Sequence, residues 1–265
     1  MFNDLDNDGL FDPGDGEQGI ADVPVEVWDQ AMTTVFGSTT TAADGTYFLD
    51  VNLRAGIYKV VENIDESTLG RGALLPGSKS GSADVGLLDG KERAGNLGGT
   101  VDNTQDSNEI GNIVVGAPGT TPDAVDYLFA EISPSQMTGI IWLDSNNNGV
   151  IDFNELLGQL GLEPDVSLVS LTGTDDRGNA AGAPAILISG ITGEALFYGF
   201  FGLRPGTYTV TENQPASLAD GKDSLGTVNG TSSGNSSVND QFSDIVLPSP
   251  NSNGEDYNFG ERPLP

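Results

Sequence analysis

Two acidic twelve-residue segments, 140 positions apart, constrain the fold of this chain more than any other feature of its sequence. Each places oxygen-bearing side chains at alternate positions around a glycine, Gly9 in the first and Gly149 in the second. This is the spacing of a calcium loop, in which positions 1, 3, 5, 9 and 12 supply side-chain oxygens, position 7 supplies a carbonyl, and a glycine at position 6 turns the chain. Calcium is a hard cation that prefers six to eight oxygen ligands. The sequence therefore predicts one calcium ion in each segment.

The predicted ligands are read directly from these positions. In the first segment they are Asp4, Asp6, Asp8, the carbonyl of Leu10, Asp12 and Asp15. In the second segment they are Asp144, Asn146, Asn148, the carbonyl of Val150, Asp152 and Glu155. The alternative is an ordinary solvated turn, since Asp, Asn and Gly are common turn residues. Two segments that match at the same positions disfavour that alternative.

The residues around the loops are not those of a helix–loop–helix pair. Residues 138–143, before the second loop, are short, rich in β-branched side chains and preceded by Pro134, which is typical of a strand. Residues 156–162, after it, are long enough for at most one or two helical turns. We therefore expect each ion to lie at the end of a strand.

The composition favours an all-β fold and limits the functions of the chain. With 265 residues, 37 Gly and 14 Pro, the chain predicts two turn-rich domains. Its net charge of −29 disfavours nucleic-acid and anionic-membrane partners and favours cations. The absence of Cys and His excludes disulfides, zinc sites built on those residues and thiol or serine–histidine catalysis. The sequence has no apolar run long enough for a membrane helix.

An internal repeat extends well beyond the loops and predicts two domains, 1–133 and 138–262, with a short join that contains Pro134. Segments recur in the same order in both halves: 23–28 and 166–171, 44–49 and 194–198, 53–63 and 203–213, 89–91 and 220–222, 110–115 and 242–247, and 126–131 and 256–261. Aligning the loops indicates that the first copy begins inside its own first strand. We therefore expect the chain to be a piece of a longer protein, with any export signal outside it.

The ordered motifs resemble the SdrD B-like domain. They are an aromatic residue, the acidic loop, a strand of alternating valines, Asp-Gly-Thr-Tyr-Phe, then Gly-x-Tyr-x-Val-x-Glu and Tyr-x-Phe-x-Glu. The family consists of Cna B-related, prealbumin-like Greek-key β-sandwiches that occur in tandem in bacterial surface proteins. The resemblance implies two such domains, each with an EF-hand-like calcium loop, which act as a rigid, non-enzymatic stalk or spacer of a cell-surface or secreted protein such as an adhesin. It also implies contact with neighbouring repeats. The departures are Asp15 in place of the usual terminal glutamate, an insertion at 174–184 and the absence of Asp-Gly at 194–195.

Other functions have weaker support in the sequence. An accessory module for an extracellular protein or glycan is the main alternative, but the aromatic residues occupy repeat-equivalent positions that favour a core. A dockerin would hold its two loops within a few tens of residues. Glu62 and Glu212 could assist a Lys–Asn isopeptide bond, but the second domain offers one lysine, Lys222, in a loop. We expect both glutamates to be hydrogen-bonded strand ends. No carboxylate pair stands out as catalytic, so we expect no enzyme activity.

Overall fold

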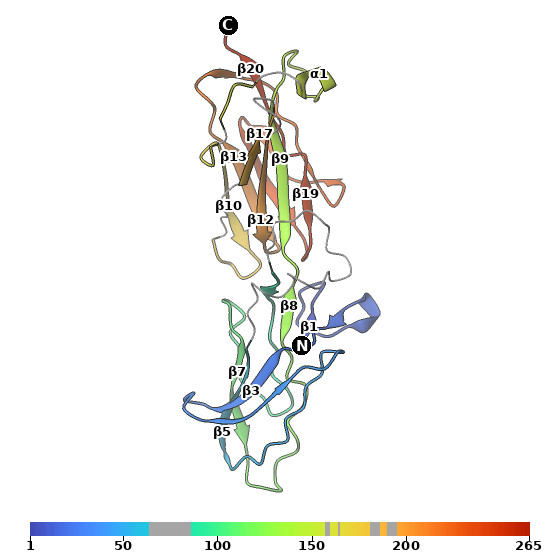
Figure 1. Ribbon diagram of the computed structural model, residues 1–265, viewed down its shortest axis with the longest axis vertical. Helices are drawn as coiled ribbons and strands as arrows, with labels where there is room; N and C mark the ends of the chain where they lie inside the picture. Colours follow the sequence, from blue (N-terminus) through green and yellow to red (C-terminus); the bar gives the residue numbers. More distant parts are fainter. Residues whose placement is uncertain (64–85, 157–159, 164, 181–185, 190–194) are drawn as a thin grey trace. The chain divides into compact units, whose positions relative to one another are not determined.

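The structure is a computed structural model that describes residues 1–63, 86–156, 160–163, 165–180, 186–189 and 195–265. The chain divides into two compact units, which meet between Ser133 and Pro134. Strands dominate both units, so the predicted all-β fold is confirmed (Figure 1). Within the described residues, no helix has the length and apolar character that crossing a membrane requires.

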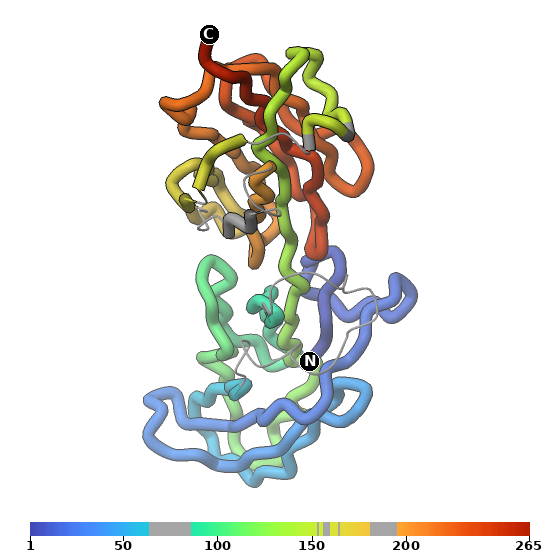
Figure 2. The backbone as a smooth tube through the Cα atoms, turned by 45° about the horizontal axis from the view of Figure 1, so that its top comes forward, coloured from blue at the N-terminus to red at the C-terminus, as the bar shows by residue number. Residues whose placement is uncertain are grey.

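The first unit contains two four-stranded sheets. One has the order β2-β1-β8-β6, and the other has the order β4-β3-β5-β7. The strands of the first sheet are β1 (Phe2–Asn3), β2 (Gln18–Gly19), β6 (Leu88–Asp89) and β8 (Ala130–Ile132). Those of the second are β3 (Pro24–Asp29), β4 (Val35–Thr40), β5 (Gly56–Glu62) and β7 (Glu109–Val115). The first acidic loop lies between β1 and β2, which pair antiparallel, and ends in the short 3-10 helix η1 (Pro13–Asp15) (Figure 2).

The second unit repeats much of this plan, with a first strand of nine residues where the first unit has two. One sheet has the order β10-β13-β18-β17, with β10 (Val169–Asp175), β13 (Gly206–Glu212), β17 (Asn235–Val238) and β18 (Gln241–Leu247). The other is built around the central strand β9 (Ser135–Leu143), which lies between β12 and β19. Its remaining strands are β11 (Ile186–Ser189), β12 (Leu196–Leu203), β14 (Leu218–Asp220), β15 (Thr227–Val228), β16 (Thr231–Ser232), β19 (Asn253–Glu255) and β20 (Phe259–Pro263). The second loop follows β9 and includes α1 (Phe153–Leu156).

Each core lies between the two sheets of its unit, as in a β-sandwich. In the second unit, buried side chains of β9 and β12 pack with those of β13 and β18 in one cluster. The predicted core role of four aromatic residues is confirmed, because all are buried: Tyr127, Phe129, Tyr257 and Phe259. Phe259 lies 4.7 Å from Phe242 between ring centroids. The residues that close each repeat therefore fill its core.

The internal repeat extends to fine detail of the backbone. β5 pairs with β7, and β13 with β18, each with a register shift that follows the tyrosine of the Gly-x-Tyr-x-Val motif. In both units this tyrosine donates a hydrogen bond from its hydroxyl to a backbone carbonyl four residues earlier, from Tyr58 to Arg54 at 2.9 Å and from Tyr208 to Arg204 at 2.7 Å. The two units are thus variants of one structural plan.

Two predicted elements differ from the structure. The strand expected at residues 166–171 begins at Val169, because residues 166–168 form a turn in which Leu168 donates its N–H to the carbonyl of Asp165. The equivalent segments 44–49 and 194–198 also differ from each other. In the second unit, β12 lies between β9 and β11, whereas residues 46–49 have no strand assignment and Phe48 is 80% exposed. Glu194, part of this comparison, lies outside the described residues.

Candidate metal centres

The first acidic loop is organised around the carboxylate of Asp4, which is fully buried at the end of β1. Asp4 accepts hydrogen bonds from the backbone N–H groups of Asp8, at 3.3 Å, and Gly9, at 2.8 Å. The carboxylate of Asp6 accepts from the N–H of Asp8 at 3.2 Å, and that of Asp8 accepts from the N–H of Leu10 at 2.7 Å. One carboxylate oxygen from each of Asp4, Asp6 and Asp8 lies within 4.8 Å of the others. The structure thus brings together the first three predicted ligands.

The second loop reproduces the same bonds one for one. Asp144, also fully buried, accepts from the N–H groups of Asn148 at 3.0 Å and Gly149 at 2.9 Å. The side-chain oxygens of Asn146 and Asn148 accept from N–H groups two residues further on, at 2.9 and 2.6 Å. Asp152 lies against Asn146, whose amide donates to it at 2.9 Å. The predicted ligands at positions 1, 3, 5 and 9 of this loop are therefore neighbours in space.

Both loops need left-handed backbone at the same two positions. Gly9 and Gly149, at position 6, have φ angles of 79° and 75°. Asn7 and Asn147, at position 4, have φ angles of 62° and 56°. Glycine and asparagine are the residues that adopt this region at least cost. The sequence analysis anticipated the glycine but missed the asparagine, which the composition of both loops already contained.

The loops differ at their closing residue. In the second loop the buried Glu155 accepts through Oε2 from the N–H of Asp152 at 3.2 Å, and through Oε1 from Asn146. In the first loop the acceptor that corresponds to Glu155 is Glu17, because its Oε2 accepts a hydrogen bond from the N–H of Asp12 at 2.7 Å. Glu17 is buried, whereas Asp15, which the spacing predicts at position 12, is exposed in η1.

The displacement has a local cause. Residues Pro13–Asp15 form the 3-10 turn, and Gly16 ends it with a φ of 97°. This turn adds two residues to the first loop, so Glu17 stands at position 14 of the loop instead of position 12. Asp15 keeps its carboxylate on the exposed side of the turn. Glu17 occupies the place that Glu155 holds in the second loop.

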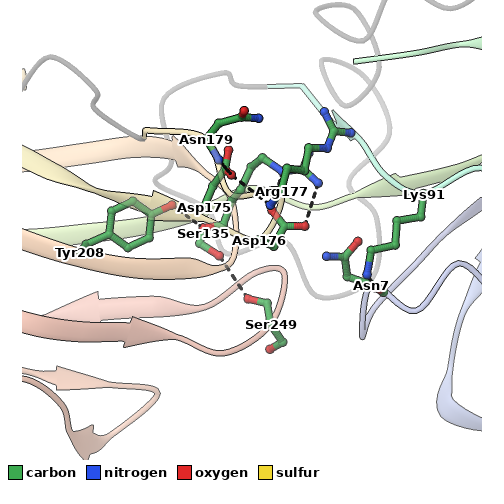
Figure 3. A network of polar contacts seen from close by, with 10 residues as sticks. Asn7, Lys91, Ser135, Asp175, Asp176, Arg177, Asn179, Tyr208 and Ser249 are labelled. Atoms are coloured by element: carbon green, nitrogen blue, oxygen red, sulfur yellow. Dashed lines mark hydrogen bonds and ion pairs between the residues drawn. The ribbon is translucent and has the colours of Figure 1, made fainter. Parts of the chain in front are cut away.

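Burial and nearby charge shape the electrostatics of the first loop. Burial raises the pKa of Asp4, although the N–H groups of Gly9 and Asn7 act in the opposite direction. Burial also raises the pKa of Glu17. Lys91 donates from its ammonium group to the backbone carbonyl of Asn7, and Figure 3 shows its side chain extended toward that residue. A cation bound among these carboxylates would reduce the repulsion that burial intensifies.

The remaining predicted ligands are placed but not tested. Asp12 lies on the exposed surface of the first loop, and Leu10 is half-buried. Val150 is exposed in the second. Their roles as calcium ligands stay predictions, and so does the binding of calcium by either loop.

Sequence reasoning missed a second group of carboxylates in each unit. One carboxylate oxygen from each of Glu62, Asp89 and Glu131 lies within 4.8 Å of the others in the first unit. The second unit has an equivalent group around Glu212. The signal was present in the sequence, because the repeated Asp-Gly-Lys and Tyr-x-Phe-x-Glu motifs supply acids to both groups. The prediction that Glu212 is hydrogen-bonded is wrong, since neither of its carboxylate oxygens has a hydrogen-bond partner among the described residues.

Residues 1–108 match the SdrD B-like domain. The predicted resemblance to this family is therefore confirmed, and the match includes the whole first loop. The second unit shares with the first the bonds of the acidic loop, the register shift and the tyrosine contact.

Two curated relatives illustrate the family. Serine-aspartate repeat-containing protein D of Staphylococcus aureus is 26% identical over 183 residues, which are 68% of this chain and 11% of that protein. Colossin-B of Dictyostelium discoideum is 29% identical over 165 residues, which are 58% of this chain and 4% of that protein. The chain thus spans about a tenth or less of the length of these relatives.

Solved structures give a looser likeness. The shaft pilin SpaA of Lactobacillus rhamnosus GG is 11% identical, with a TM-score of 0.29, and the alignment covers 98% of this chain and 94% of the pilin. The TIE protein of Bacillus anthracis is 10% identical, with a TM-score of 0.26 and coverage of 94% of this chain and 32% of the other. At TM-scores this low the backbones superpose only loosely, so this likeness says nothing about function.

Proposed function

We propose that this chain is a pair of calcium-binding structural repeats, which act as a stiff spacer in a cell-surface or secreted multidomain protein of a bacterium. The observation that carries the proposal is a set of four side-chain-to-backbone hydrogen bonds that recurs at the same positions of the two loops. Asp4 and Asp144 are fully buried carboxylates at strand ends, and each is surrounded by further side-chain oxygens. Such a group is expensive to bury without a cation.

We further propose that Glu17, not Asp15, is the closing ligand of the first loop. Its carboxylate braces the same backbone position as Glu155, and it is buried as Glu155 is. The ligands of the first loop are then Asp4, Asp6, Asp8, the carbonyl of Leu10, Asp12 and Glu17. The longer glutamate side chain can bind calcium through both oxygens, as the last ligand of an EF-hand does.

We propose a role as a spacer, rather than an enzyme, from the positions of the polar groups. The fold needs no disulfide, since the chain has no cysteine, and metal ions at strand ends would take over that stiffening role. The clustered carboxylates contact backbone N–H groups of their own loops rather than a cleft. Neighbouring repeats of the same protein are the expected partners, and the location is extracellular.

Calorimetric titration of calcium into the full chain tests the loop assignments. Asp4→Ala and Asp144→Ala should each abolish one loop site and leave the site in the other unit intact. Asp22→Ala, an exposed turn residue outside both loops, serves as the control. Unchanged calcium binding by either loop variant would contradict the assignment for that loop.

One observation favours an additional binding role. A hollow on the second unit is lined by residues that include three aromatic and three polar side chains: Phe197, Tyr198, Phe201, Thr138, Asp256 and Asn258. Phe197 is 49% exposed there. An accessory role in holding an extracellular glycan or protein is therefore the second candidate function. Phe197→Ala should abolish the binding of the chain to a glycan array, and a parent chain that binds no glycan or protein would contradict this second role.

A further inference from the structure

The hollow on the second unit lies over two neighbouring strands, β9 and β12 (Figure 1). Side chains alternate between the two faces of a strand, so Phe197, Gly199 and Phe201 share one face of β12. That face is turned away from the core, because Leu196 and Phe200 on the other face belong to the core cluster. The hollow therefore opens on the outer surface of the sheet, where a partner can reach it.

A glycine makes room for the aromatic wall of the hollow. A Cβ atom at Gly199 would lie 2.7 Å from the ring of Phe201, too close for a side chain, and 3.4 Å from the methyl group of Thr138. At another side of the hollow Ile151 packs against the buried Ile140. The hollow measures about 530 Å³, and ligand sites commonly measure about 300–1,000 Å³. It is large enough for one side chain of a partner with its adjoining backbone.

Most polar side chains that line the hollow are already engaged by the backbone. The hydroxyl groups of Thr138 and Tyr198 donate to backbone carbonyls at 3.2 and 2.5 Å. The side-chain oxygen of Asn258 accepts from a backbone N–H at 3.0 Å. A glycan needs polar groups that converge on its hydroxyls, and these three side chains are largely taken. The lining thus favours an apolar ligand with a single polar end.

The carboxylate of Asp256 is the exception. Asp256 is exposed, and its side chain has no hydrogen-bond or ion-pair partner among the described residues. None of the described residues that line the hollow is basic. The face of an aromatic ring attracts a cation, and a carboxylate forms strong charge-assisted hydrogen bonds with one. Exposed aromatic rings beside an unpartnered carboxylate therefore suit a positively charged ligand.

We propose that this hollow binds an arginine side chain of an extracellular protein, an inference that rests on the second role proposed above. The guanidinium group is planar, stacks on aromatic rings and pairs with a carboxylate through two hydrogen bonds. Its three-carbon stem suits the apolar part of the hollow. The net charge of −29 attracts a basic partner over longer distances. Phe197 and Phe201 would contact the arginine, and Asp256 would pair with it.

The first unit keeps the carboxylate but lacks the aromatic wall. Asp126 corresponds to Asp256, because each directly precedes the Tyr-x-Phe-x-Glu motif, is exposed and has a φ of 64°. In each unit a tyrosine hydroxyl donates to the carbonyl of the residue after this aspartate. Aligning these tyrosines places Thr46 and Asp50 at the positions of the two phenylalanines. The proposed site therefore belongs to the second unit, and Asp126 provides a matched control.

Fluorescence anisotropy on the full chain tests the proposal. The probes are a labelled peptide with one arginine between two leucines, and the same peptide with uncharged citrulline in place of arginine. The parent should bind the arginine peptide about tenfold more tightly than the citrulline peptide. Asp256→Asn should lose this preference, whereas Asp126→Asn removes the same charge from the same backbone conformation and should keep it. Phe197→Ala should weaken binding of the arginine peptide, and Phe48→Ala, at an exposed ring of the first unit, should not.

Equal losses in Asp256→Asn and Asp126→Asn would overturn the proposal, because the peptide would then respond to net charge alone. Glycan binding that Phe197→Ala abolishes, in a chain with no preference for arginine, would support the second role and overturn this choice of partner. A parent chain that binds neither glycans nor the arginine peptide would overturn both. The calcium titrations of the loop variants test the spacer separately from all three results.

Discussion

Replacing Glu17 by glutamine tests whether this residue is the last ligand of the first loop. The carboxylate of Glu17 accepts backbone hydrogen bonds from Leu5 at 3.0 Å and from Asp12 at 2.7 Å, one through each oxygen. Glutamine keeps one acceptor oxygen and places an amide N–H₂ donor where the second acceptor stood. Asp15→Asn is the matched control, because Asp15 is exposed.

The expected size of the effect follows from these two bonds. A hydrogen bond to a charged group contributes about 1.5–3 kcal/mol. Glu17→Gln loses one such bond and weakens the other to a neutral one, so it should lower the free energy of unfolding of the first unit by about 2 kcal/mol. That loss corresponds to roughly 6–10 °C in melting temperature for a unit of this size. Asp15→Asn should change the free energy of unfolding by less than about 0.5 kcal/mol.

Calcium adds a second readout to the same pair of variants. If Glu17 is a ligand, Glu17→Gln should weaken calcium binding by the first loop at least about tenfold, or about 1.4 kcal/mol, in calorimetric titration. Asp15→Asn should bind as the parent does. The reverse result, with calcium binding lost in Asp15→Asn and kept in Glu17→Gln, would refute the reasoning and restore the simple twelve-residue spacing.

Two further predictions concern pH and the core. Burial and neighbouring acids raise the folded-state pKa of Glu212 to about 10, of Glu261 to about 7 and of Asp223 to about 6, while Asp220, Asp240 and the backbone-bonded Arg262 surround them. The folded state then holds more protons than the unfolded state above about pH 4.5, so the metal-free chain should lose stability as the pH rises from 5.5 to 8. Calorimetry in metal-free buffers should show that the melting temperature of the second unit falls over this range. A melting temperature that rises with pH would contradict the raised pKa values of these carboxyl groups. In the first unit, Phe129→Ala removes a fully buried side chain and should lower the free energy of unfolding, measured in urea, by about 3–5 kcal/mol. Phe48→Ala removes a side chain that is 80% exposed and should change this free energy little. Equal losses in the two variants would contradict the described core.

The order of the strands could be predicted from the sequence, because the alternation of apolar residues and the internal repeat indicate the same strands. Alternating valines, the Gly-x-Tyr-x-Val-x-Glu motif and the closing aromatic residues each appear twice, and the structure places both copies in equivalent strands. The differences arise where tertiary pairing decides. Residues 46–49 share their pattern with the start of β12 but do not form a strand, because strand formation depends on a partner that local sequence does not reveal.

The site was predictable only in part, for a similar reason. A linear spacing locates carboxylates that follow one another along the chain, such as those of Asp4, Asp6 and Asp8. It fails at Glu17, because a 3-10 turn inserts two residues that a fixed twelve-residue pattern cannot accommodate. It also fails for the cluster around Glu212, whose members come from three distant segments and meet only through sheet register.

Thermal unfolding of the full chain with and without calcium tests the central claim most directly. The account predicts that millimolar calcium raises the melting temperature of both units above that in a chelator at pH 7.5, because calcium binds the folded state alone. An equal concentration of magnesium should raise it less, since magnesium demands a smaller and more regular shell. Identical melting curves in calcium and in chelator would contradict the claim that these repeats are calcium-binding modules.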